Sequence, residues 1–237
     1  SRRCRLARRY TDLPMLVMLK AHTLPSGERV MVPDRYVRAS DFGDQLGQAN
    51  NPEWKTVALN EDGRVVVPQG AIGFRWGADG RADKGQWNLE SREAREGADV
   101  KLRLSMLEAG ADGCATAQVG FPYFGGIQSA HFPGNVQDDV LVRTVPVHQI
   151  AIGASGELAM VATVFDLQAA NYGVPRGLPC ELAAASYDED TPYTPAWQEK
   201  ITGVPRDQVI TVAREFAGNA DKTHGKSMVI IGAAMNH

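Results

Sequence analysis

The sequence predicts an α/β protein, with incomplete doubly wound α/β segments at about residues 10–20 and 163–237 and a loop- and β-rich insertion between them. Three observations predict this fold class. Residues 13–19 form a continuous apolar run, which is typical of a strand covered on both faces. Residues 193–237 read as two helices, a β-branched apolar strand and a glycine turn, which together make half of a doubly wound unit. The middle of the chain is rich in turns and poor in helical periodicity.

These patterns divide the chain into three parts. Residues 1–42 are expected to be an α/β segment with a buried strand and a linker, 43–162 a β-hairpin-rich insertion, and 163–237 an α/β half-unit that ends in a turn facing a cofactor. A strand that ends in a glycine turn usually leads to a ligand or to the next helix. We therefore expect this chain to be a piece of a larger protein.

The composition is that of an ordinary globular protein, with 43% hydrophobic and 22% charged residues among 237. The net charge of −3 provides no basic field, so we expect no nucleic-acid partner. Cys4, Cys114 and Cys180 are far apart, and no CxxC pair predicts a zinc or iron–sulfur site built from this chain alone. No apolar run approaches the roughly 20 residues that span a bilayer.

Two hairpins are predicted in the middle of the chain. The first pairs residues 54–59 with 64–67 across a four-residue connection that ends in Gly63. The second pairs residues 140–152 with 157–164. Between them, residues 101–107 alternate apolar and polar side chains, the period of a half-buried strand.

Two short helices are predicted from local signals. Residues 164–171 have helical spacing and end before Gly173, a suitable position for a left-handed residue. Further along, Thr194 is expected to cap a helix over residues 196–201, with Pro195 at its first position and a glycine after it.

A longer helix and a strand complete the predicted elements. The helix is expected to run from Pro205 to about Ala217 and to end at Gly218 and Asn219. Its apolar positions predict one buried face, made of Val209, Ile210, Val212, Ala213, Phe216 and Ala217. Residues 227–231 are then predicted to be a buried parallel strand.

The turn after this strand is the strongest candidate for a ligand site. In open α/β sheets, ligands bind beyond the carboxyl ends of the strands, and small residues there let backbone N–H groups approach a phosphate or a pterin edge. Asn236 offers a donor and an acceptor, and His237 offers a donor. The predicted cofactor-binding residues are Gly232, Ala233, Met235, Asn236 and His237. The alternative is a turn that only connects a strand to a helix.

No other residues predict a self-contained active site. His22, His131, His148 and His224 are scattered without a partner at ligand spacing. The acidic clusters at 138–139 and 188–190 fit a hard metal or general catalysis, or simply solvated loops. We therefore assign no catalytic residue and no metal ligand to this chain.

The helix pair resembles a signature of the molybdopterin oxidoreductases, the relatives of dimethyl-sulfoxide reductase. The resemblance is carried by Tyr-Thr-Pro-Ala-Trp at 193–197, Ile-Thr-Gly-Val-Pro at 201–205 and Ala-Arg-Glu-Phe-Ala at 213–217. The stretches RRYTDLPMLVML, VGFPYFGG, TVFDLQAANYGV and DKTHGKSMVIIGAAMNH further resemble the catalytic alpha subunits of membrane-bound respiratory nitrate reductases. Ala234 stands where the family pattern has glycine.

The resemblance implies an enzyme that reduces nitrate to nitrite by oxygen-atom transfer at molybdenum held by two molybdopterin guanine dinucleotides. It also implies a [4Fe-4S] cluster, an iron–sulfur beta subunit, a cytochrome b gamma subunit and a place at the cytoplasmic face of the cell membrane. The family's molybdenum and cluster ligands fall outside this chain, which is expected to be inactive alone. Residues 43–160 resemble an insertion for which we expect a packing or subunit-contact role.

Two other functions remain open at this stage. A nitrite oxidoreductase alpha subunit has a related sequence and runs the reaction in reverse. A non-catalytic α/β module that binds a nucleotide or scaffolds an assembly belongs to a different class. A coding region that continues in frame beyond His237 would favour either enzyme over the module.

Overall fold

A computed structural model describes residues 8, 11–24, 26–43, 45–46, 53–69, 92–93, 100–109, 114–122, 140–178, 181, 183–223 and 227–230. The chain divides into two compact units. Unit 1 contains Ser1–Gly125 and Ser129–Ala183, and unit 2 contains Gly126–Gln128 and Ala184–His237. No helix among the described residues is long and apolar enough to cross a membrane.

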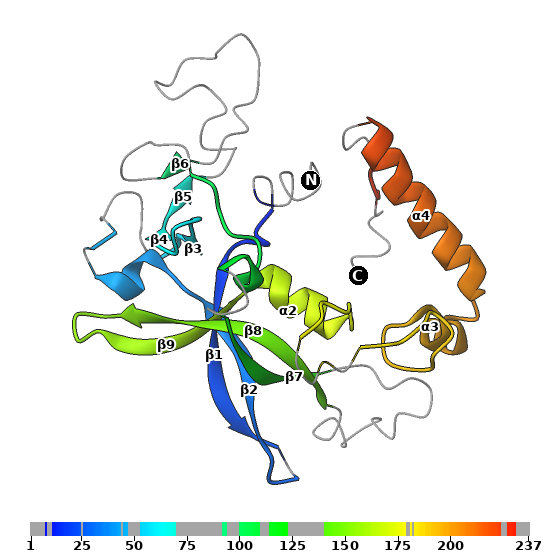
Figure 1. Cartoon of the computed structure of the whole chain (residues 1–237), viewed down its shortest axis with the longest axis horizontal. Helices are drawn as coiled ribbons and strands as arrows, with labels where there is room; N and C mark the ends of the chain where they lie inside the picture. The colour runs from blue at the N-terminus through cyan, green and yellow to red at the C-terminus, as the bar shows by residue number, and fades with distance from the viewer. Residues whose placement is uncertain are drawn as a thin grey trace. The chain divides into compact units, whose positions relative to one another are not determined.

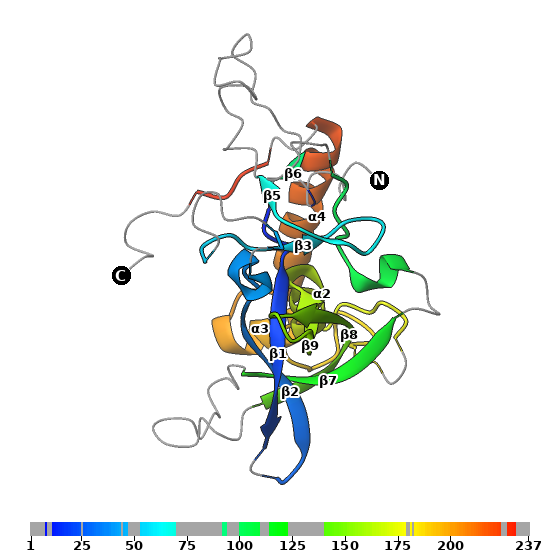
Figure 2. The same ribbon diagram turned by 90° about the vertical axis from the view of Figure 1, so that its left-hand side faces the viewer.

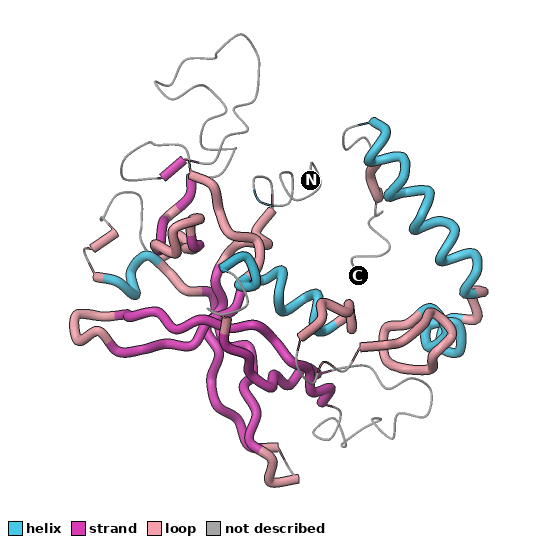
Figure 3. The backbone as a smooth tube through the Cα atoms, viewed as in Figure 1, coloured by secondary structure: helices cyan, strands magenta, loops and turns pink. Residues whose placement is uncertain are grey.

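Unit 1 is built on a closed five-stranded barrel in the order β1-β2-β7-β8-β9 (Figures 1 and 3). Neighbouring strands are antiparallel, except that β2 and β7 run parallel where Met31 lies opposite Val119. The strands are β1 (Leu16–Thr23), β2 (Arg29–Tyr36), β7 (Ala115–Pro122), β8 (Val140–Ile152) and β9 (Glu157–Thr163).

Strand β1 accounts for the apolar run near the start of the chain. Leu16 packs into one core cluster with Val37, whereas Val17 and Leu19 pack into a second cluster with Val145. Successive side chains of a strand point to opposite faces, so a strand between two cores is apolar throughout. The predicted burial of both faces is confirmed.

The doubly wound setting predicted for residues 10–20 is corrected by the strand pairing. β1 pairs antiparallel with β2 on one side and with β9 on the other. A strand buried on both faces occurs in a barrel covered by other elements as well as in a parallel sheet, so apolarity alone does not distinguish the two. Strands and helices are both present, as predicted.

Both predicted hairpins are confirmed. β3 (Ala58–Leu59) pairs antiparallel with β4 (Val65–Val66). β8 and β9 pair from His148 opposite Val161 to Ile152 opposite Glu157. A further short pair joins β5 (Pro68–Gln69) to β6 (Arg92–Glu93).

The strand predicted over residues 101–107 is wrong. The structure has a 3-10 helix, η3 (Met106–Ala109), and Leu102 makes only an isolated bridge to Asn60. The Ser105 hydroxyl and the Met106 N–H both donate to the buried Asp166 carboxylate, which turns the chain away from an extended course. A second 3-10 helix, η1, spans Ala39–Phe42.

Helix α2 (Val164–Asn171) follows β9 directly and contacts β8 and β9 (Figure 1). Thr163 caps it by accepting a hydrogen bond from the Asp166 N–H at 3.0 Å. Gly173 follows with φ of 67°, a left-handed conformation that glycine adopts readily. Both ends of this helix were predicted correctly.

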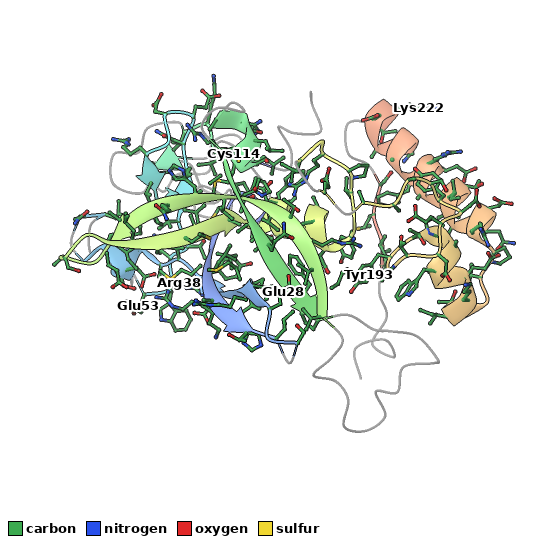
Figure 4. The ribbon with its side chains drawn as sticks, turned by 60° about the horizontal axis from the view of Figure 1, so that its bottom comes forward. Glu28, Arg38, Glu53, Cys114, Tyr193 and Lys222 are labelled. Atoms are coloured by element: carbon green, nitrogen blue, oxygen red, sulfur yellow. The ribbon has the colours of Figure 1, made fainter. Side chains whose placement is uncertain are left out.

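Unit 2 contains helices α3 (Pro195–Thr202) and α4 (Arg206–Thr223). Thr194 caps α3 as predicted by accepting from the Trp197 N–H at 3.1 Å, and Gly203 ends it with φ of 74°. The ring of Tyr193, labelled in Figure 4, lies 5.3 Å from the Trp197 ring.

Two predictions about the end of the chain are corrected. Helix α4 passes through Gly218 and Asn219 and ends at Thr223 (Figure 2), because an interior glycine costs only about 1 kcal/mol in an established helix. None of its residues is buried within this chain. The described residues 227–230 are in no strand, since no described strand of unit 2 lies beside them.

Candidate functional site

A groove opens in unit 1 between helix α2 and the barrel strands β1, β2 and β7. Its volume is about 310 Å³, at the lower end of the range for small-molecule pockets. The floor is apolar and the rim is polar. The lining residues are Val17, Pro33, Asp34, Arg35, Tyr36, Phe121, Val164, Leu167, Gln168 and Asn171.

The charged residues on the rim are already paired within the protein. Lys20 binds Asp34 at 2.7 Å. Arg35 forms a two-pronged pair with the Asp41 carboxylate at 2.7 and 2.8 Å. Burial of Tyr36 raises the pKa of its phenol, helped by the hydrogen bond that its hydroxyl donates to Asp12. No described group on the rim therefore has the character of a catalytic acid or base.

The Arg35–Asp41 pair also shapes the chain beside the groove. Partial burial by itself raises the pKa of Asp41, but hydrogen bonds from Arg35 and from the Arg38 N–H outweigh it, so the pKa lies below its ordinary value. The same carboxylate caps the first turn of η1 through the Arg38 N–H at 2.7 Å. Arg38, labelled in Figure 4, also donates to the Trp54 carbonyl at 2.8 Å.

Helix α2 is held in place by a buried charge, Asp166. Its carboxylate accepts hydrogen bonds from the Ser105 hydroxyl at 2.6 Å, the Met106 N–H at 2.8 Å and the Thr163 hydroxyl at 2.8 Å. The Arg176 guanidinium is the fourth donor to this carboxylate, at 2.6 Å. Burial raises the pKa of Asp166 even though all four donors stabilise the ionised form. With the side chain fully buried, Asp166 acts as an anchor rather than as a ligand-binding group.

The groove offers an apolar floor, and a buried polar atom lies behind it. Asn171 lines it from the last turn of α2, and in the described part of the chain its buried Oδ1 accepts no hydrogen bond. Phe121, Leu167 and Val17 supply apolar contacts. Because an oxygen buried in this way is out of a ligand's reach, the described lining suits contact with an apolar group only.

Known proteins show similarity to nearly the whole chain. The alpha chain of respiratory nitrate reductase 1 from Escherichia coli (strain K12) is 51% identical over 230 residues, covering 97% of this chain and 17% of that one. The nitrate reductase alpha chain of Bacillus subtilis (strain 168) is 38% identical over 232 residues, covering 98% of this chain and 17% of that one. The chain is related to a segment of nitrate reductase alpha chains. No family model matches it.

The nitrate reductase alpha chain of Mycobacterium tuberculosis (strain H37Rv) is a third relative, 38% identical over 233 residues and covering 97% of this chain. This chain spans about 17% of the length of the nitrate reductase alpha chains that it matches. The similarity extends over both units, because almost every residue of the chain lies in the matched region.

The cofactor-binding residues predicted from the sequence lie outside the described residues. Gly232, Ala233, Met235, Asn236 and His237 all follow Ile230, where the description ends. Their assignment stays a prediction.

The acidic cluster at 188–190, in contrast, has a visible role. Asp188 binds Arg206 at 2.9 Å, Glu189 accepts from the Ala185 N–H, and Asp190 pairs with Lys200. These acids hold the α3–α4 region together, which favours the structural reading of the cluster over a metal site. Within the described ranges, no three His, Cys, Asp or Glu side chains gather as metal ligands would.

The Asp166 anchor was missed by the sequence reasoning. A signal was available, because Thr163 and Asp166 have the spacing of a capping box, in which a hydroxyl residue is followed three positions later by an acid or amide. No local pattern indicates the other donors, since Ser105 and Asp166 are separated by 61 positions.

Proposed function

We propose that this chain is a segment of the catalytic alpha subunit of a nitrate reductase. The complete protein would reduce nitrate to nitrite by oxygen-atom transfer at molybdenum, in anaerobic respiration that draws electrons from quinol. The observation that carries the proposal is 51% identity over 97% of the chain with a respiratory nitrate reductase alpha chain.

Within that enzyme, the segment would contribute scaffold and one wall of the cofactor pocket. The wall would be the turn that contains Gly232, Asn236 and His237, approached by a molybdopterin guanine dinucleotide. The sequence supports this role through the small residues and polar side chains of the turn. When bound, the molybdenum cofactor would supply the oxygen-atom transfer. The described residues form no ligand set for a metal, so no step is assigned to them.

The names of the relatives favour nitrate reduction over nitrite oxidation. The first two matches at 51% identity and the matches at 38% all carry the name nitrate reductase. A non-catalytic module is disfavoured by the same matches, because they cover both units of the chain and not a single domain.

The name alpha chain supports the proposal of further subunits. We infer an iron–sulfur beta subunit and a membrane cytochrome b gamma subunit, with the alpha subunit at the cytoplasmic face of the cell membrane. A [4Fe-4S] cluster in the alpha subunit would have its ligands in the part of the protein outside these residues.

The doubly wound arrangement is also retained as a proposal for the end of the chain. Helix α4 followed by an apolar segment has the order of half an α/β unit. The missing strands would come from the rest of the alpha subunit.

The decisive experiment uses the full-length protein. Purified full-length protein should oxidise reduced methyl viologen only when nitrate is added, and should contain molybdenum and pterin. Full-length material that is inactive and free of molybdenum would refute the proposal. Activity only in the opposite direction, with nitrite as the reductant of an electron acceptor, would favour the nitrite oxidoreductase.

A further inference from the structure

Helix α4 carries an apolar stripe that the described residues of unit 2 leave partly uncovered. The stripe consists of Val209, Val212, Phe216 and Ala220, which fall at the three- and four-residue spacings of one helix face. Val212 is 63% exposed and Phe216 is 42% exposed. Surface helices of globular proteins normally turn such a stripe towards a core.

The other side of α4 is polar. Asp207, Thr211, Glu215 and Lys222 lie there, and all four are exposed. Lys222 is labelled near the end of the helix in Figure 4. Because consecutive residues turn by about 100° around a helix, Thr211 and Val212 are neighbours in sequence but belong to different faces. The helix is therefore amphipathic, with its apolar side open.

A second apolar element is fastened to the same helix. The Asn219 side-chain amide donates to the Ser227 hydroxyl at 2.9 Å, and that hydroxyl donates to the Phe216 carbonyl at 3.0 Å. These bonds bring the chain back beside the C-terminal half of α4. Met228, Val229 and Ile230 then follow with exposures of 77%, 71% and 82%. Three consecutive apolar side chains require cover on both sides of the backbone.

We propose that the apolar stripe and residues 228–230 form one internal interface of the longer protein. Its occupant would be uncharged, apolar secondary structure from the part of the alpha subunit outside these 237 residues. This inference rests on the proposed function, in which the chain is about 17% of an alpha chain. The length that remains is more than enough to supply neighbouring strands and helices.

The chemistry of the surface favours this occupant over a partner subunit that binds reversibly. The stripe contains no charged residue, and the three apolar residues beside it would add their backbone N–H and C=O groups to the surface. A sheet satisfies such groups by strand pairing while it covers the side chains. Reversible interfaces are more polar than this and resemble the ordinary protein surface in composition.

The test measures cysteine labelling in the full-length alpha subunit, expressed without its partner subunits. Val212→Cys and Phe216→Cys are compared with Thr211→Cys, which lies on the polar side of the same turn of α4. Maleimide labelling is read at each position by peptide mass spectrometry, so other cysteines do not interfere. We expect the first two variants to label at least 100-fold more slowly than Thr211→Cys in the native protein and equally fast in urea.

Three outcomes would overturn the inference. In the first, Val212→Cys and Phe216→Cys label as fast as Thr211→Cys. In the second, protection arises only after the partner subunits are added, which would make the stripe a subunit interface. In the third, protection depends on protein concentration, which would indicate a second copy of the chain.

Two further measurements keep the test decisive. Hydrogen exchange of the α4 amides in the unaltered alpha subunit reports the same protection if a cysteine variant fails to fold. Methyl viologen oxidation by Thr211→Cys separates this inference from the proposed function. If the enzyme is active but Val212→Cys is labelled rapidly, only the proposed interface is refuted. If the enzyme is inactive but Val212→Cys is protected, only the proposed function is refuted.

Discussion

The Arg176 guanidinium donates to the Asp166 carboxylate at 2.6 Å, where the Arg176 side chain is 9% exposed and the Asp166 side chain 0%. The pair joins the first turn of α2 to the segment that follows Gly173. Because Ser105 and Met106 donate to the same carboxylate, three separate stretches of unit 1 meet at one charge. The position of α2, and with it one wall of the groove, depends on this contact.

Replacing Asp166 by Asn should loosen that junction. The substitution keeps the shape of the side chain but leaves the Arg176 charge buried without its partner, which typically costs about 3–5 kcal/mol. Hydrogen exchange in the full-length protein should show faster exchange of the Met106 amide and of the first turn of α2. Asp34→Asn, which breaks the exposed pair with Lys20, is the control and should cost less than about 1 kcal/mol. Equal effects of the two variants would contradict the anchor role.

Asp41 should make unit 1 sensitive to acid. Its pKa in the folded protein lies below the ordinary 3.8, with burial opposed and outweighed by Arg35 and Arg38. Its contribution to stability is therefore complete above the unfolded pKa and is lost as the pH falls through the folded pKa. Pulse-labelling hydrogen exchange after incubation in urea between pH 5 and 3 measures this loss, with every pulse at one fixed pH. The Asp41→Asn variant should be less stable than the wild type at pH 5 and should lose less stability between pH 5 and 3. If stability depends on pH equally in the variant and the wild type, Asp41 is not the source of the acid sensitivity.

Gly120 should not tolerate a side chain. A Cβ at this position of β7 would lie 2.8 Å from Cγ1 of Val140 and 3.3 Å from Cγ2 of Val30. Overpacking of this kind costs about 1–3 kcal/mol, so Gly120→Ala should lower the temperature at which the β7 amides lose exchange protection. Gly218→Ala is the matched control and should not destabilise the protein. A Cβ at this position has no atom within 4 Å, and alanine is favoured over glycine inside a helix. Destabilisation by both variants alike would mean that crowding is not the cause.

The turn at the end of the chain should hold the cofactor. Asn236→Ala and His237→Ala would each remove a hydrogen bond to a charged ligand, worth about 1.5–3 kcal/mol, which corresponds to roughly a 10–100-fold loss of affinity. Molybdenum and pterin content per mole of full-length protein should therefore fall in both variants. Lys222→Ala, on the polar side of α4, should keep its full content. Wild-type cofactor content in both turn variants would remove these residues from the site.

Local signals in the sequence were sufficient for several elements. Gly63 and the flanking β-branched residues specify the β3–β4 hairpin, and Thr194, Pro195 and Gly203 bound α3. Turns and caps depend on residues within a few positions of one another, so the sequence pattern contains the whole interaction.

The candidate site was accessible to sequence reasoning only in part. Among the apolar residues of the groove, Val17 lies in the run 13–19 that was predicted to be buried, whereas no burial was predicted for Leu167. Their assembly into a groove was not predicted, because it requires α2 to lie beside β1, β2 and β7, which are distant from it along the chain. The role of Asp188 in holding Arg206 likewise depends on how the chain folds back after α3.

By itself, the sequence determined the apolar character of β1, the ends of α2 and α3, both hairpins and the resemblance to nitrate reductase alpha chains. Only the tertiary structure decided that β1 closes a barrel against β9, that Ser105 turns towards Asp166, and that Val212 and Phe216 of α4 are exposed within unit 2. The physical reason is the separation of the partners along the chain. The sequence of a strand shows that both of its faces are covered. The pairing of β1 with β9, however, depends on contacts between residues more than a hundred positions apart.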